Sequence, residues 1–158
     1  MRVGIFALFA IAGFFFIGAF RHYETEPMPL TYTQYVAKYG EGILPTNSNK
    51  IQLMTASAGL QGRAWAHRFS APLESMNAYA DKEYRLYDTD REKSPNVLRF
   101  KAADEVVQPD FRAFRIGYMD WFDLDGLTNV LTIQRDHAQR PFIYIDTNDL
   151  TYYSWWID

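Results

Sequence analysis

The residues best suited to binding chemistry in this sequence lie between Arg63 and Phe69. Alternation in this stretch predicts a strand that places Arg63, Trp65 and His67 on one face, with Arg68 next to them in the chain. Guanidinium, imidazole and indole groups together can hold an anion or a carboxylate by charge-assisted hydrogen bonds and stacking. The alternative is a solvated sheet face on which Trp65 covers the arginine stems. We therefore treat Arg63, Trp65, His67 and Arg68 as a candidate ligand site.

Two other stretches resemble functional motifs but lack essential members. Ser57, in the sequence TASAG, resembles a nucleophile elbow, but the first glycine is missing and a strand follows where that motif needs a helix. The aspartates in 120–125 are rich in oxygen ligands. Aligning Gly126 with the EF-hand glycine, however, places Thr132 where a bidentate Glu belongs. A turn serine and an acidic turn are the better interpretations.

The histidines and the absence of cysteine restrict metal and thiol chemistry. His22, His67 and His137 show no spacing typical of a zinc site. The sequence contains no Cys, which excludes thiol catalysis and thiolate metal ligands. We therefore predict no metal, no cofactor and no catalytic residues.

Four aromatic residues near the C-terminus form a second candidate site, for a partner. Alternation places Tyr152 and Trp156 on one face of the last strand and Tyr153 and Trp155 on the other. A sheet that is apolar on both faces must be covered on both, and one predicted helix can cover only one of them. The second cover is either the chain itself, through the other predicted helix or the aromatic segment 109–126, or a partner protein or glycan, because Tyr and Trp are favoured at interfaces.

Local patterns predict the elements that position these residues. The apolar spacing of residues 32–39 predicts a helix with Thr31 as its N-cap and Gly40 at its end. A hairpin of strands 50–55 and 60–69 follows, with its turn at residues 57–59. Pro72 opens a second helix that reaches about Tyr84.

The C-terminal half is predicted to form mainly strands. Residues 97–102 alternate as a strand, and residues 109–126 fit either a helical turn or an aromatic loop. Three further runs, at residues 130–135, 142–147 and 150–157, predict an antiparallel meander. The fold class is therefore α+β: an antiparallel sheet, including this three-strand meander, packed by one or two helices.

An apolar stretch at the start of the chain predicts a membrane anchor. Val3 to Phe20 contains no charge, hydroxyl or amide, and forms roughly 27 Å of helix, enough to cross a bilayer. The alternatives are a cleaved signal peptide, for which Phe20-Arg21 is a poor cleavage site, and a core helix of a soluble protein. We predict a transmembrane signal-anchor helix at 1–22, a proline-containing tether at 23–30 and a single α+β domain at 31–158.

Charge and composition give the expected location. Arg2 and Arg21 flank the apolar stretch almost equally, and the two-residue leader favours a cytoplasmic N-terminus with an exported domain. The net charge of −3 argues against nucleic acid as a partner, and the lack of Cys suits either side of a bacterial membrane. The expected location is the inner or plasma membrane, with a single pass and an extracytoplasmic domain.

Two functions are compatible with these features. The first is a membrane-anchored, non-catalytic accessory domain that binds an envelope protein or a wall component. The second is a small membrane-surface enzyme or anion-binding domain that uses His67 with Arg63 and Arg68. A deep pocket that joins His67 to a carboxylate would favour the second function, and an exposed aromatic patch would favour the first.

Overall fold

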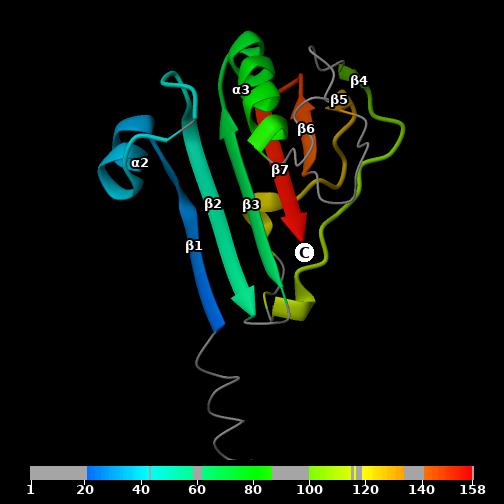
Figure 1. The fold of residues 1–158 in the computed structure, drawn as a ribbon. Coiled ribbons are helices and arrows are strands. Elements are labelled where there is room, and N and C mark those ends of the chain that lie inside the picture. The colour runs from blue at the N-terminus through cyan, green and yellow to red at the C-terminus, as the bar shows by residue number, and fades with distance from the viewer. Residues whose placement is uncertain are drawn as a thin grey trace, which may run out of the picture.

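The computed structural model of the protein describes residues 21–42, 44–58, 62–86, 100–114, 116, 119–133 and 141–157. Within these ranges seven strands form one antiparallel sheet in the order β1-β2-β3-β7-β6-β5-β4 (Figure 1). Their bounds are β1 (Arg21–Leu30), β2 (Asn49–Ala58), β3 (Arg63–Ser70), β4 (Phe100–Ala102), β5 (Val130–Ile133), β6 (Phe142–Asp146) and β7 (Thr151–Ile157). The predicted α+β class with an antiparallel sheet is confirmed.

The same ranges contain two α-helices, α2 (Tyr32–Tyr39) and α3 (Leu73–Leu86), and two 3-10 turns, η2 (Arg112–Phe114) and η3 (Asp120–Phe122). Thr31 caps α2 as predicted, because its hydroxyl accepts from the Gln34 amide while the Gln34 side chain accepts from the Thr31 amide. The predicted β2–β3 hairpin and the β5-β6-β7 meander are also confirmed. The predicted position of the hairpin turn is wrong, because residues 57 and 58 still belong to β2 and Ser57 pairs with Arg63. Of the strand predicted at 97–102, residues 100–102 form β4 and the others lie outside the described residues.

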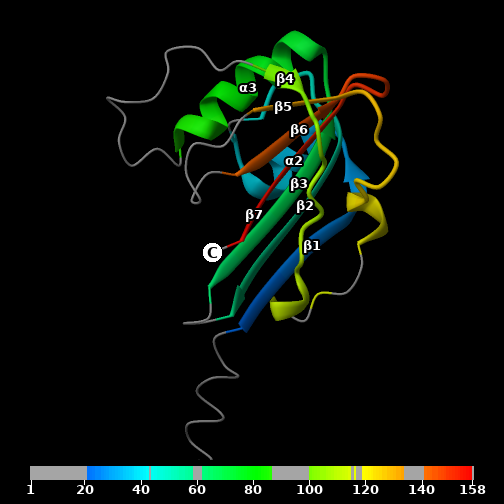
Figure 2. The same cartoon turned by 90° about the vertical axis from the view of Figure 1, so that its right-hand side faces the viewer.

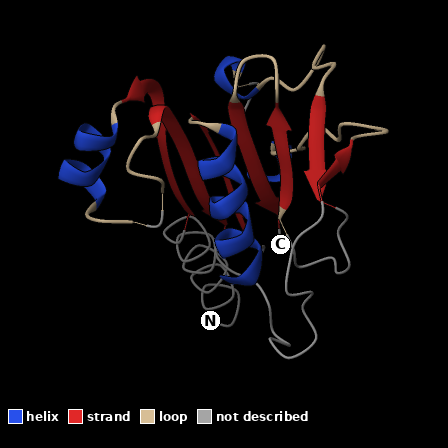
Figure 3. Cartoon of the chain, turned by 90° about the horizontal axis from the view of Figure 1, so that it is seen from above, coloured by secondary structure: helices blue, strands red, loops and turns tan. Residues whose placement is uncertain are grey.

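The two faces of the sheet carry separate apolar cores. The helix α3 packs across one face, and the segment 103–127, which contains η2 and η3, covers the other (Figure 2). Seen from above, α3 crosses the sheet and α2 lies beside its β1 edge (Figure 3). The described residues of the segment that the sequence left open therefore form an internal cover, folded as 3-10 turns and extended chain.

Strand alternation divides the aromatic residues between the two cores. The core beneath α3 includes Phe69, Met76, Tyr79, Tyr84, Ile143, Ile145 and Tyr152. The core beneath the segment 103–127 includes Ala64, Ala66, Phe111, Ile116, Met119, Trp121, Phe122, Tyr153 and Trp155. Each side of β7 thus contributes to a different core, as its period of two requires.

The main correction concerns residues 23–30, which were predicted as a tether but belong to the edge strand β1. This strand pairs with β2 from Arg21 opposite Ala58 to Glu26 opposite Leu53, and the register shifts before Leu30. Prolines 27 and 29 fall at that irregularity, and an edge strand tolerates their missing N–H groups. Residues 21 and 22, assigned to the anchor, are also part of β1.

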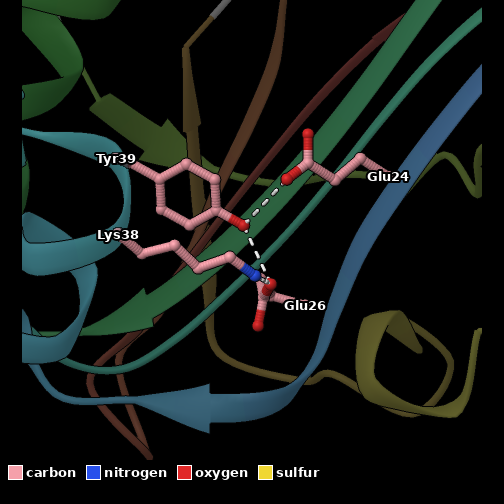
Figure 4. Close-up of polar contacts among 4 residues, drawn as sticks. All are labelled: Glu24, Glu26, Lys38 and Tyr39. Atoms are coloured by element: carbon pink, nitrogen blue, oxygen red, sulfur yellow. Dashed lines mark hydrogen bonds and ion pairs between the residues drawn. The ribbon is translucent and has the colours of Figure 1, made fainter.

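Side chains of α2 hold the acidic residues of β1 (Figure 4). Lys38 forms an ion pair with Glu26. The Tyr39 hydroxyl donates to Glu26 at 2.9 Å and lies 3.4 Å from Glu24. These contacts dock α2 against the edge strand.

The predicted membrane anchor lies almost entirely outside the described residues, which begin at residue 21. Among the helices of the described ranges, none combines the length and the apolarity that crossing a bilayer requires.

Candidate functional site

His67 lies on β3 beneath α3, where the fold brings it to a carboxylate. Its Nε2 atom lies 3.2 Å from the Tyr79 hydroxyl and 3.5 Å from Glu83 Oε1. Tyr79 and Glu83 are four residues apart, so they project from the same side of α3. Tyr152, on β7, donates a hydrogen bond to Glu83 Oε2 at 2.5 Å. We call His67, Tyr79, Glu83 and Tyr152 the His67–Glu83 cluster.

Burial controls the protonation of this cluster. It raises the pKa of Glu83 from 4.5 to about 8, although the hydrogen bond from Tyr152 acts in the opposite direction. Burial lowers the pKa of His67 from 6.5 to about 3 and raises that of Tyr152 well above its usual value. Between about pH 3 and pH 8 the folded pair therefore holds one titratable proton, whichever of the two residues carries it.

The His67–Glu83 cluster contains an acid and a base but gives a substrate little access. Glu83 is 2% exposed and Tyr152 is fully buried. Rings also enclose the imidazole, which stacks on Trp65 at 5.2 Å and on Phe69 at 6.2 Å between ring centroids. Its evident role is to join α3 to the sheet through polar contacts inside an otherwise apolar core.

The predicted ligand residues do not converge on one site. Trp65 and His67 share a face and stack, as expected, and Arg63 is exposed at the start of β3. Arg68 lies on the opposite face, where its Nε donates to Gln52 Oε1 at 2.7 Å. Because the sheet separates Arg68 from His67, the two guanidinium groups and the imidazole cannot bind one anion together.

The predicted partner residues are mostly internal. Tyr152 is 0%, Tyr153 7% and Trp155 6% exposed. Trp155 stacks on Phe142 with a centroid distance of 4.1 Å and an interplanar angle of 12°. Trp156 is half-buried and lies opposite Trp65 in the β3–β7 register. Three of the four side chains are thus core residues and are not available to a partner.

The structure adds a cavity that sequence reasoning missed. It has a volume of about 550 Å³ and lies over the sheet face opposite α3. The residues that line it belong to one segment: Gln108, Pro109, Asp110, Phe111, Arg112, Ile116, Met119 and Phe122. The aromatic and methionine content of this segment is the only sequence signal that could have indicated it, and that signal equally fits core packing.

The cavity combines an apolar wall with a charged rim. Phe111, Ile116, Met119 and Phe122 are buried and supply apolar atoms. At the rim Arg112 forms a bidentate ion pair with Asp110, with N–O distances of 2.8 and 2.6 Å. The Arg112 guanidinium lowers the pKa of Asp110 to about 2. The size lies within the range of small-molecule pockets, about 300–1,000 Å³.

Neither metal ligands nor known relatives identify the site. In the described ranges no three His, Asp or Glu side chains come together in a way that could hold a metal ion. Comparison with protein families, curated proteins and solved structures finds no match for this chain. Its function must therefore be argued from its own geometry.

Proposed function

We propose that this protein is a membrane-anchored, non-catalytic binding domain of a bacterial-type cell envelope, whose partner is another envelope protein or a wall component. The observation that carries the proposal is the cavity of about 550 Å³ at residues 108–122. A concave apolar wall with a polar rim is the usual form of a pocket that receives one anchoring side chain of a partner protein. We therefore favour a protein partner over a wall component.

The rim of the cavity adds selectivity to this binding. Arg112 and Asp110 satisfy each other and are 87% and 58% exposed at their side chains. A pre-formed ion pair exposes both charges to a partner in a fixed geometry, and such rim charges affect association rate and specificity more than affinity. The apolar wall would then supply most of the binding free energy.

The anchored location is supported by the apolar stretch Val3 to Phe20, which ends one residue before β1 begins. On this proposal the domain lies at the outer surface of the inner or plasma membrane, with the N-terminus in the cytoplasm. Alkaline extraction of membranes would test the anchor, and a reporter fused after Asp158 that is active only when translocated would test the orientation. Release of the intact chain by alkali, or activity of a strictly cytoplasmic reporter, would contradict these two assignments.

The alternative, a membrane-surface enzyme or anion site at His67, has one observation in its favour: His67 does meet a carboxylate. Two observations weigh against it. Tyr79, Glu83 and Tyr152 are buried around His67, and Arg68 faces away from the cluster. Binding at the cavity is therefore the better-supported function.

The binding function is tested by site-specific crosslinking in native membranes. A photoreactive amino acid in place of Gln108, at the cavity rim, should give a discrete adduct with one protein. The matched control carries the same group in place of Met28, which is 72% exposed on β1. This control should give no discrete adduct.

Filling the cavity should then lower the yield of that adduct. Met119→Trp places a larger ring in the hollow, and we expect the yield to fall about tenfold while the melting temperature stays near that of the wild type. Ile116→Trp is a second variant in case the first is misfolded. An adduct of undiminished yield from folded, cavity-filled protein would disprove binding at this site.

A further inference from the structure

One end of the sheet combines exposed cationic and aromatic residues with the start of the described chain. Arg21 pairs with Ala58, and Ser57 pairs with Arg63, so β1 begins where β2 ends and β3 begins. With strands about 4.8 Å apart, the backbone of Arg63 lies about 10 Å from that of Arg21. Figures 1 and 2 both show η2, which carries Arg112, at this same end.

Connectivity fixes which way this end faces. Phe20 ends the apolar stretch, and Arg21 is already paired in β1. One residue spans at most about 3.6 Å, so no flexible linker separates the stretch from the sheet. If residues 3–20 cross the bilayer, the end that holds Arg63 must lie at the lipid headgroups.

The side chains at this end suit such an environment. Arg63 is exposed and forms no ion pair with any described residue. Trp65 and Trp156 are half-buried neighbours on β3 and β7, on the same face as Arg63. Tyr23, two residues into β1, is 51% exposed and projects from the opposite face at this end, because it pairs with Ala56. Tyrosine and tryptophan favour the membrane interface, and arginine binds phosphate groups in a bidentate manner.

The opposing charges at this end are already neutralised in part. Asp110 is paired with Arg112, whereas Glu24 lies 3.4 Å from the uncharged Tyr39 hydroxyl and keeps its charge. Because the whole chain carries a net charge of −3, attraction to an anionic surface must come from this local arrangement and not from the overall charge.

We infer that the sheet end defined by Arg63, Trp65 and Trp156 is a contact surface for the headgroups of anionic phospholipids. The inference rests on the proposed anchor and deepens it. The domain is then not free to tumble above the bilayer but is held by its Arg63 end, with the opposite end of the sheet directed away from the membrane.

The absence of cysteine allows a direct test with the full-length chain. Ser57→Cys, opposite Arg63, is labelled with an environment-sensitive fluorophore, and the protein is reconstituted in phosphatidylcholine vesicles with or without phosphatidylglycerol. We expect the label to be shielded from aqueous iodide when phosphatidylglycerol is present, and more exposed in its absence or in high salt.

Matched variants separate a local contact from general electrostatics. Arg63→Gln should lower the ratio of shielded to exposed label about fivefold, the usual contribution of one basic residue near an anionic surface. Lys50→Gln is the control, because Lys50 is exposed at the opposite end of β2, roughly 23 Å from Ser57. That variant should leave shielding unchanged.

The outcomes distinguish the contact from the anchor. Equal iodide quenching in both lipid mixtures, or equal effects of Arg63→Gln and Lys50→Gln, would overturn the lipid contact while leaving the anchor intact. Failure of the wild-type chain to float with vesicles of either composition would instead reject the anchor, and the lipid contact with it.

Discussion

The Tyr152 hydroxyl and the Glu83 carboxylate, sixty-nine residues apart in the chain, meet at 2.5 Å beneath α3. The bond connects the last strand to the helix that covers it. It also supplies a donor to the Glu83 carboxyl group, which is 2% exposed. Burying that group without a hydrogen bond would cost a large amount of folding free energy. This contact and its neighbour His67 have consequences that can be measured.

The first prediction is a plateau of stability between pH 4.5 and 6.5. Above pH 4.5 the unfolded chain loses the Glu83 proton while the folded state keeps it until about pH 8, so stability falls as pH rises. For His67 the folded pKa is about 3 and the ordinary value 6.5, so stability falls as pH falls below 6.5. Between 4.5 and 6.5 the two slopes cancel.

Urea unfolding of the detergent-solubilised protein from pH 4 to 8.5 measures this profile. Between pH 6.5 and 8 the free energy of unfolding should fall by at most about 1.4 kcal/mol per pH unit. Glu83→Gln should remove that fall, whereas Glu74→Gln, exposed in the first turn of the same helix, should retain it. A wild-type profile without any decline between pH 6.5 and 8 would contradict a buried, protonated Glu83.

The second prediction concerns Tyr152→Phe. The substitution keeps the ring that packs on Phe69 at 4.9 Å but removes the donor to Glu83. We expect a loss of about 1–3 kcal/mol, the cost of leaving a buried acceptor without its partner. Tyr32→Phe, on the half-exposed side of α2, is the control and should change stability by less than about 0.5 kcal/mol. Equal effects of the two variants would show that the hydrogen bond contributes little.

The third prediction contrasts Trp155 with Trp156. Trp155 is 6% exposed, lies against Phe111 and stacks on Phe142, so Trp155→Ala should cost about 3–5 kcal/mol. Trp156 is half-buried, and its truncation should cost clearly less. Thermal unfolding of both variants decides the point. Equal losses would mean that Trp156 is as much a core residue as Trp155.

The fourth prediction tests the role of β1. A fragment that begins at Thr31 lacks β1 and exposes the edge of β2, which carries Ile51, Leu53 and Met54. We expect this fragment to aggregate or to unfold at a markedly lower temperature than one that begins at Arg21, because an unpaired apolar edge strand associates with other chains. Indistinguishable melting curves would show that β1 is dispensable and that residues 23–30 act as a tether after all.

Sequence reasoning succeeded where short-range patterns decide the structure. The Thr31 cap, the β2–β3 hairpin and the C-terminal meander all follow from residues within a few positions of one another. The alternation of β7 also predicted that Tyr152 and Trp155 would face opposite sides.

The sequence by itself determined the α+β class, most element positions and the apolar stretch that suggests an anchor, because each depends on local period and composition. Only the tertiary structure decided that β1 is a strand, since its partner β2 begins nineteen residues after the proline-rich segment ends. It alone placed the segment 103–127 over the second face and brought Glu83 to His67. These contacts join residues distant in the chain, and their free energy comes from burial and pairing that no local pattern encodes.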